Sequence, residues 1–356
     1  MGLMDSLKKA CKTKGQEMVR EALEGKDGSR APDDAEAYAE KVAEAISADV
    51  RMFSGCMDSQ TSADVHDVSK FGLPNADGAG GACTNAMLLN LSDDQQDSWL
   101  SLLKGMQSTL KGKKFSQIPQ LSTSRQIDVM DNFTLVNEKS NGNMRSLLIG
   151  INYIGQQGEL AGCHNDVSMM TNFITTHGYD TDPEHCLILM DDGSHTDPTH
   201  KNIMNGLRWL VSGASAGDSL FMHYSGHGGS VRDTNGDEAD NMDETIVPMD
   251  YTSAGQITDD VILKELVMVL PEGVTLTVVM DCCHSGSILD LPYTIKADSG
   301  TIHAVEEGDA PSAMPMNPGF DFAKMLKIGK ELYAIFSKGG GLDSASMGRI
   351  AKLAMS

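Results

Sequence analysis

Short apolar runs rich in β-branched residues alternate with segments of helical spacing along the second half of the chain. Residues 274–279 (VTLTVV) are too few for a typical helix and are predicted to form a buried strand. A similar run at 219–223 predicts another strand. Further strands are expected at 145–152 and 186–190, and helices at 166–177, 201–211 and 258–270. This alternation indicates βαβ units and a largely parallel sheet.

The first half of the chain is predicted to hold more helix than strand. Helices are expected at 33–48 with Asp33 or Asp34 as the N-cap, at 82–91, and at 95–110 after the cap candidates Ser92 and Asp93. A strand is expected at 50–54, and an extended segment at 115–124, which contains a Pro. The polar residues 131–144 are predicted to be a connector. After 298 we expect a helix at 322–336 and a flexible end.

Two of the predicted strands end on residues that suit nucleophilic catalysis. The last strand, 274–279, leads to Cys283 in the segment DCCHSGS, and the strand at 219–223 leads to His227 in HYSGHGG, 56 positions earlier. Open α/β sheets place their chemistry at the carboxyl ends of their strands. Because a thiol is mostly protonated near neutral pH, Cys283 needs a base such as His227. Backbone N–H groups of Gly228 and Cys283 are predicted to bind the oxyanion.

Two other interpretations of these residues are considered. Cys282 is the rival nucleophile, but strand alternation places its side chain on the face opposite to that of Cys283. A metal site would use His223, His227, Cys282, Cys283 and His284. Histidines four positions apart face one side in a helix, whereas this stretch is predicted to be a strand, and adjacent cysteines chelate poorly. The sequence therefore favours a Cys283–His227 pair.

These segments resemble the metacaspases, the caspase-like cysteine peptidases of plants, fungi and protists. A histidine about fifty residues before the cysteine is the caspase-type arrangement. The resemblance covers residues 145–291 as the large catalytic subdomain. The segments MFSGCMDSQTSAD (52–64), GGACTNA (80–86) and QIPQLS (117–122) look like the small subdomain. The small subdomain usually follows the large one; here it comes first, which is similar to the type III metacaspases of algae.

The resemblance implies a caspase-like α/β fold, a three-layer sandwich with a mostly parallel central sheet flanked by helices and with reversed subdomain order. The expected parts are an N-terminal extension and linker at 1–32, a small (p10-like) subdomain at 33–130, a connector at 131–144, a large (p20-like) catalytic subdomain at 145–297 and a C-terminal tail at 298–356. A monomer is implied as well. In relatives with the usual order, cleavage between the subdomains often accompanies activation. That linker lies on the other side of the catalytic half here, so we predict that the uncut chain is active.

Charge beside the nucleophile predicts the substrate. Asp281 lies two positions before Cys283 on the same strand face, and a carboxylate there would attract Arg or Lys and repel acidic side chains. The resemblance adds further substrate-binding residues, with Asp58 and Ser62 at the pocket rim: Cys163, Asp166, Ser225, Asp58 and Ser62. It implies protein or peptide substrates cleaved after Arg or Lys. In the structural alternative, Asp166 caps its own helix and Ser225 fills a tight turn.

Calcium is the implied cofactor. Four carboxylates match the family's calcium ligands by motif: Asp243, Asp259, Asp260 and Asp290. Carboxylates from separate loops suit a hard cation that takes about six to eight oxygens. The structural alternative for two of them is N-capping of the helix after Thr258. We expect Ca²⁺ to order the loops between Asp243 and Asp290 and so complete the substrate cleft.

Two further function classes stay open. A catalytically silent member of the family would act as a scaffold or calcium-sensing regulator, although the presence of both Cys283 and His227 favours an enzyme. A hydrolase of small esters or amides would use the same pair, but nothing in the sequence indicates a small closed pocket.

Composition narrows the location and the partners. A formal charge of −22 argues against general nucleic-acid binding. No run of about 18 apolar residues occurs, so no transmembrane segment is expected. The 7 cysteines are odd in number, lack paired Cys-x-x-Cys spacing and follow no secretory leader, which predicts a reducing, cytoplasmic location.

The N-terminal sequence MGLMDS fits the myristoylation pattern at Gly2. One acyl chain binds membranes only marginally, and the second signal would come from Cys11 as a palmitoylation site or from the lysines around it. The alternative is an ordinary lysine-rich helix. Lipidation would place a cytoplasmic protein at the membrane surface.

Overall fold

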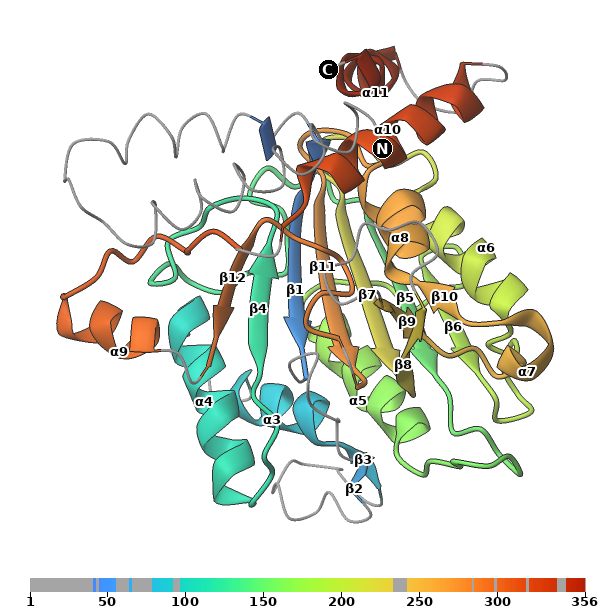
Figure 1. Ribbon diagram of the computed structural model, residues 1–356. Helices are drawn as coiled ribbons and strands as arrows, with labels where there is room; N and C mark the ends of the chain where they lie inside the picture. Colours follow the sequence, from blue (N-terminus) through green and yellow to red (C-terminus); the bar gives the residue numbers. More distant parts are fainter. Residues whose placement is uncertain are drawn as a thin grey trace, which may run out of the picture.

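A seven-stranded sheet carries both halves of the chain in the computed structural model (Figure 1). The structure describes residues 41–42, 45–55, 64–65, 79–91, 97–232, 242–283, 285–297, 300–317, 320–337 and 344–355. The strands lie in the order β12-β4-β1-β11-β7-β5-β6. Their bounds are β1 (Asp49–Ser54), β4 (Gln120–Thr123), β5 (Met144–Gly150), β6 (Cys186–Met190), β7 (Ser219–Ser225), β11 (Thr275–Asp281) and β12 (Tyr293–Lys296). Strand β4 runs antiparallel to both its neighbours, and the other pairs are parallel.

The first half of the chain enters this sheet directly beside the strands of the second half. Strand β1 pairs in parallel with β11 over its whole length, from Asp49 opposite Thr275 to Ser54 opposite Met280. Strand β4 extends the sheet beyond β1, and β12 is the edge strand on this side. The two halves therefore form one continuous sheet, with the half that comes first in the chain placed next to the strand that leads to Cys283.

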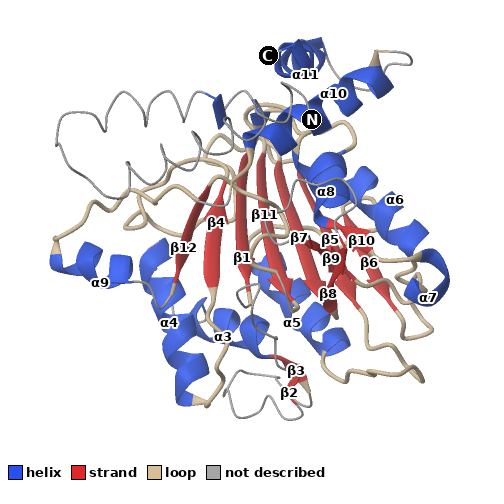
Figure 2. Ribbon diagram, in the orientation of Figure 1, coloured by secondary structure: helices blue, strands red, loops and turns tan. Residues whose placement is uncertain are grey.

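Helices cover both faces of the sheet (Figure 2). One face packs against α3 (Ala82–Leu91), α4 (Trp99–Gly112), α5 (Cys163–Thr176) and α9 (Gly300–Glu307). The other packs against α6 (His200–Val211), α8 (Asp259–Ile262), the π-helical turn η2 (Leu263–Val267), α10 (Phe322–Phe336) and α11 (Ser344–Met355). The predicted three-layer α/β architecture with a mostly parallel sheet is confirmed.

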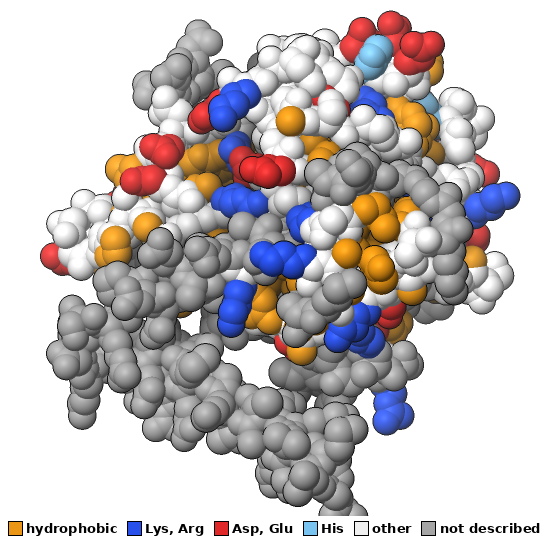
Figure 3. All heavy atoms as spheres, turned by 90° about the horizontal axis from the view of Figure 1, so that it is seen from above, with side chains coloured by type: hydrophobic (Ala, Val, Ile, Leu, Met, Phe, Trp, Pro, Cys, Tyr) orange, Lys and Arg blue, Asp and Glu red, His pale blue; other side chains and the backbone are white. Residues whose placement is uncertain are grey.

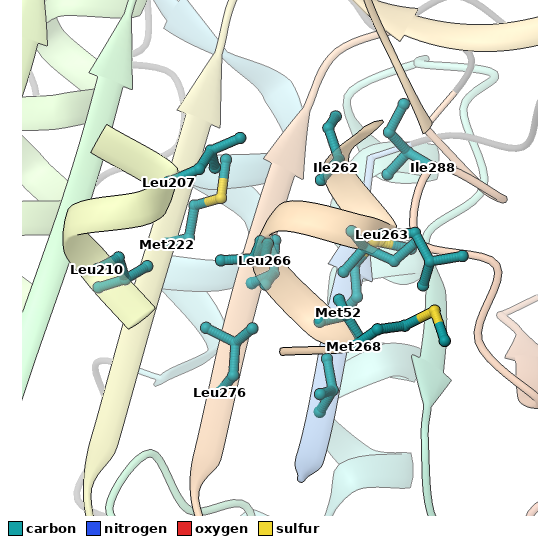
Figure 4. Close-up of a cluster of buried hydrophobic side chains, with 14 of the residues drawn as sticks. Met52, Leu207, Leu210, Met222, Ile262, Leu263, Leu266, Met268, Leu276 and Ile288 are labelled. Atoms are coloured by element: carbon teal, nitrogen blue, oxygen red, sulfur yellow. The ribbon is translucent and has the colours of Figure 1, made fainter. Parts of the chain in front are cut away.

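Helix α6 illustrates how the sequence specifies this packing. Thr199 caps the helix, with its side chain accepting a hydrogen bond from Asn202 N. Apolar residues at helical spacing, among them Leu207 and Leu210, then form one buried face. Figure 4 shows these two leucines against Met222 of β7. Each such buried side chain contributes about 1.5–3 kcal/mol.

Smaller elements surround the carboxyl ends of the strands. A three-stranded sheet contains β8 (Gly228–Arg232), β9 (Met242–Ile246) and β10 (Ile257–Thr258). A two-stranded pair joins β2 (Asp64–Val65) to β3 (Gly80–Gly81), and a single turn forms α7 (Tyr251–Ala254). None of the helices in the described ranges is long and apolar enough to cross a membrane.

One expectation about secondary structure needs refinement, and two were wrong. The helix expected at 258–270 is present over 259–267, but its second part is the π-helical turn η2, after which Met268 N donates to Leu263 O. Strand β11 is not the last strand, because β12 follows; at four residues it is too short to show a periodic pattern. The end of the chain is not wholly irregular, because residues 344–355 form α11, which packs closely on α10 where Gly329 leaves room for Leu353.

Other expectations concern the N-terminal half. The helix expected at 95–110 begins at Trp99, capped by Ser98, whose hydroxyl accepts from Ser101 N. The cap candidates Ser92 and Asp93 lie outside the described residues, as do Gly2, Cys11 and most of the helix expected at 33–48.

Candidate active site

The two loops predicted to carry the chemistry leave the sheet side by side. Strands β7 and β11 are parallel neighbours, and their last residues, Ser225 and Asp281, are in register. His227 and Cys283 each lie two positions further on. A Cβ placed on Gly228 would come within 1.8 Å of Cys283 O and 3.2 Å of Cys283 N. The backbone after His227 therefore lies directly against that of Cys283.

The His227 side chain is held by a backbone carbonyl. Its Nε2 lies 2.6 Å from Gly158 O. A carbonyl oxygen accepts hydrogen bonds only, so this contact assigns the proton to Nε2 and leaves Nδ1 of the neutral ring as a proton acceptor. Gly158 has φ of +84°, and a Cβ there would lie 3.1 Å from His227 Nε2. A glycine suits both the left-handed turn and the close approach of the ring.

Two buried tyrosines fix the backbone of His227. Tyr153 Oη accepts from His227 N at 3.0 Å and donates to Val247 O at 2.6 Å. Tyr224 Oη donates to His227 O at 2.7 Å. Burial raises the pKa of both hydroxyls, so both stay protonated. The ring of Tyr153 also lies 4.6 Å from that of His227, centroid to centroid.

The loop that contains Gly158 is anchored by Asp191. Its carboxylate accepts from Asn152 N at 2.8 Å and Ile154 N at 3.2 Å, and lies 2.6 Å from His164 Nε2. Burial alone would raise the pKa of Asp191, but the bonds from His164 and the two backbone amides outweigh it and lower the pKa. The sequence analysis identified neither Asp191 nor the two tyrosines. Their positions, just beyond β5 and β6 and at the end of β7, are the signal that could have indicated them.

The adjacent cysteines have different surroundings. Cys282 is 1% exposed and belongs to the apolar cluster on the α6 face of the sheet, whereas Cys283 is half-buried on the turn after β11. Buried apolar surroundings favour the inert thiol form. Of the pair, Cys283 is the more accessible.

The predicted substrate-binding residues of the catalytic half converge on the start of α3. Ser225 Oγ donates to Asp166 Oδ2 at 2.7 Å. Gly81 N approaches both oxygens of Asp166, at 2.9 and 2.8 Å, and Thr84 N donates to Asp281 Oδ2 at 2.7 Å. A Cβ on Gly81 would lie 2.1 Å from Asp281 Oδ2 and 2.8 Å from Asp166 Oδ2. The two carboxylates thus flank Gly81.

The structural alternative for Asp166, capping of its own helix, does not describe the main contact of this side chain. This buried carboxylate accepts the amide of Gly81, the last residue of β3, across the boundary between the two halves. Cys163 is buried at the first residue of α5, three positions before Asp166. Asp58 and Ser62 lie outside the described residues.

Three of the four predicted calcium ligands surround one ammonium group. Lys324 Nζ lies 2.8 Å from Asp259 Oδ2, 3.0 Å from Asp260 Oδ1 and 2.6 Å from Asp290 Oδ2. Asp243 is buried on the neighbouring strand β9. Within the described residues, no group of three or more His, Cys, Asp or Glu side chains stands ready to hold a metal ion.

His223 does not join His227. It is fully buried in the middle of β7, with Nε2 3.3 Å from Thr84 Oγ1, while His227 lies beyond the end of the strand. Burial lowers the pKa of His223 to about 3, so the ring is neutral. His284 is outside the described residues.

Comparisons with known proteins identify the family of the chain. Residues 144–292 match the family model described as metacaspase, peptidase C14 domain, and residues 4–130 match the model of the caspase domain. Fold and matches together define a cysteine endopeptidase of the caspase type.

The relatives define the family more closely. Metacaspase III c of Phaeodactylum tricornutum is 47% identical over 300 residues, which cover 82% of this chain and 86% of that protein. The chain belongs to the metacaspases, as predicted. Metacaspase-1 of Mycosarcoma maydis is 44% identical over 55% of this chain and 49% of its own length, and Metacaspase-1A of Neurospora crassa is 50% identical over 43% and 34%. The chain therefore spans about half or less of these fungal relatives.

Among solved structures, protein GSU0716 of Geobacter sulfurreducens matches with a TM-score of 0.32 and 24% identity, over 56% of this chain and 66% of that one. This similarity is too low to support any conclusion about the fold or the function of the chain.

Proposed function

We propose that this metacaspase is a calcium-dependent endopeptidase that cleaves after Arg or Lys with a Cys283–His227 dyad and is active as an uncut chain. The observation that supports the dyad most is the backbone contact between Gly228 and Cys283, which brings the two strand-end loops together.

In the proposed mechanism, His227 Nδ1 takes the proton of the Cys283 thiol, and the thiolate attacks the scissile carbonyl carbon. The carbonyl oxygen becomes an oxyanion, and N–H groups of Gly228 and Cys283 would stabilise it. The imidazolium returns its proton to the leaving amine, and water hydrolyses the acyl-enzyme. The bond from His227 Nε2 to Gly158 O supports this role, because it orients the ring and stabilises its charged form.

Specificity for Arg or Lys is inferred from charge. Asp166 and Asp281 lie together beside Gly81, close to the strand end that leads to Cys283. Two buried carboxylates side by side favour a guanidinium or ammonium group and disfavour an acidic side chain. Ser225, bonded to Asp166, would keep that carboxylate oriented.

Calcium dependence is supported by the donor chemistry. Asp259, Asp260 and Asp290 supply oxygen atoms only, which is the ligand type that Ca²⁺ prefers, and they already converge on a cation. Together with Asp243 they would hold the metal. When bound, Ca²⁺ would supply charge compensation and order for the loop between Cys283 and Asp290.

Activity of the uncut chain is supported by the position of the connector. Asn137 bonds to Ser219 and Gly273, and Asn141 bonds to Gly217, all near the starts of β7 and β11. His227 and Cys283 lie beyond the opposite ends of these strands. A cut between 131 and 144 would therefore fall at the end of the sheet opposite to His227 and Cys283, and we expect it to leave their positions unchanged.

Assays with fluorogenic peptides that end in Arg, Lys, Asp or Leu, with calcium or with chelator, test the proposal. We expect cleavage of the Arg and Lys peptides only, only with calcium, by a chain whose intact mass is unchanged. Asp281→Asn should lower kcat/KM for Arg by about 100-fold, a loss of about 2.7 kcal/mol in transition-state binding. Asp309→Asn, an exposed carboxylate, is the control. Cleavage of every peptide at similar rates would refute the specificity, and no cleavage at all would favour the silent scaffold.

A further inference from the structure

Lys324 is buried where lysines are normally exposed. Lys and Arg side chains reach the surface near the middle of the face seen from above in Figure 3. Lys324, in the first turn of α10, is instead 2% exposed and lies on the same helix side as the buried Met325 and Ile328. Removing an ammonium group from water costs several kcal/mol unless anions compensate it.

The compensation comes from carboxylates of two separate segments. Asp259 and Asp260 begin α8, and Asp290 belongs to the loop after Cys283. Carboxylate oxygens of Asp290 and Asp259 lie 2.6 and 2.8 Å from Lys324 Nζ, so each forms a short ion pair with the buried ammonium group. A helix of the C-terminal tail thus supplies a positive charge to a cluster of three negative charges.

The loop that carries Asp290 begins at the candidate nucleophile. Asp290 lies seven positions after Cys283, and the segment runs back along the sheet to the start of β12. Ile288 and Leu289 pack it into the core, where Figure 4 shows Ile288 near Leu263. Asp290 has φ of +44°, a conformation that costs a non-glycine residue about 1 kcal/mol or more. Contacts such as the ion pair to Lys324 hold it there.

We propose that Lys324 is a tethered cation that occupies the calcium site, and that Ca²⁺ binds by displacing it. This inference rests on the calcium dependence proposed above. An ammonium group with carboxylate oxygens at 2.6–3.0 Å fills the centre that a metal would need, and Ca²⁺ takes its oxygens at about 2.3–2.6 Å. Two cations cannot share that centre, so Lys324 Nζ must leave it when Ca²⁺ binds.

Displacement of Lys324 should affect only part of the C-terminal tail. Arg349 of α11 donates to Ala45 O at 2.8 Å and to Met268 O at 2.7 Å, independently of the carboxylates. The first turn of α10 would therefore loosen when Lys324 leaves, while α11 stays attached. The C-terminal tail becomes the element that sets how much calcium is needed, because its ammonium must be expelled before the loop from Cys283 to Asp290 rearranges.

Calcium titration by calorimetry tests this in the full chain carrying Cys283→Ala, which prevents self-cleavage. Lys324→Met should bind Ca²⁺ about tenfold more tightly or better than the parent, because no tethered cation competes. Lys327→Met removes an exposed charge from the same helix and should change the affinity less than about threefold. Hydrogen exchange should show Ca²⁺-induced acceleration at 322–328 and none at 344–355 in the parent.

Equal or weaker Ca²⁺ binding by Lys324→Met, or unchanged exchange at 322–328, would overturn the displacement. Asp259→Asn separates this failure from that of the calcium assignment. If Asp259→Asn weakens binding but Lys324→Met has no effect, only the displacement is wrong; if calcium binding is insensitive to Asp259→Asn, the calcium site is wrong as well. Should Lys324→Met prove unstable without metal, a Ca²⁺-dependent rise in Tm larger than that of the parent supports displacement, and an equal or smaller rise contradicts it.

Discussion

Replacing Gly228 with alanine should disable the site while leaving the fold intact. The added Cβ would lie 1.8 Å from Cys283 O, and real Cβ contacts under 3.0 Å essentially do not occur. One of the two loops must therefore move by more than 1 Å. A displacement of about 1 Å among reacting groups costs about 100-fold in rate, or about 2.7 kcal/mol. Overpacking of this kind costs about 1–3 kcal/mol of stability.

Gly229→Ala provides the matched control. Its Cβ would meet the ends of two side chains, Gln256 Oε1 at 2.8 Å and Thr245 Oγ1 at 3.2 Å, which can shift. The assay is kcat/KM on an Arg-terminated peptide with calcium, with urea unfolding alongside. We expect a loss of about 100-fold for Gly228→Ala and less than about fivefold for Gly229→Ala. Full activity of Gly228→Ala would refute the contact between the loops as the basis of catalysis.

Three further predictions concern buried groups around the site. Tyr153→Phe removes the hydroxyl that accepts from His227 N. The free energy of unfolding in urea should fall by about 1–3 kcal/mol, and kcat should fall by about tenfold with KM little changed. An unchanged kcat would contradict the role of this hydrogen bond in holding His227 in place. The pKa of His223 is about 3 in the folded protein and about 6.5 in the unfolded chain. Between about pH 6.5 and pH 3 the unfolded chain therefore binds one proton more at this residue than the folded protein does. The free energy of unfolding falls as the pH is lowered through this range, by up to about 1.4 kcal/mol per pH unit. Unfolding midpoints of His223→Gln should lack this part of the slope, and identical slopes in both proteins would be evidence against it. Cys282→Ala should cost about 1 kcal/mol in unfolding free energy and keep kcat/KM within about threefold, and an inactive variant would reverse the assignment of the two cysteines.

The sequence predicted the sheet and the strand ends because these depend on local patterns. The β-branched run at 274–279 and the run at 219–223 became β11 and β7, and their small-residue ends identified where His227 and Cys283 emerge. The register that makes Ser225 and Asp281 neighbours is a long-range property, so only the resemblance to metacaspases could group the predicted substrate-binding residues in advance.

The rest could not be predicted, since it depends on contacts between distant segments. Nothing in α10 marks Lys324 as different from the exposed Lys327 until the fold brings Asp259 and Asp290 to it. The hydrogen bonds that hold the backbone of His227 likewise come from Tyr153 and Tyr224, at two different strand ends. Strand β12 pairs with β4, a long-range contact that four residues of sequence do not show.

Covalent labelling tests the identity of the nucleophile most directly. The full chain is treated with an Arg-terminated peptidyl halomethyl ketone in calcium, digested, and the modified residue is located by tandem mass spectrometry. We predict a single adduct on Cys283, which disappears in His227→Ala and when calcium is chelated. An adduct on Cys282, or labelling of Cys283 that does not depend on His227, would contradict the dyad.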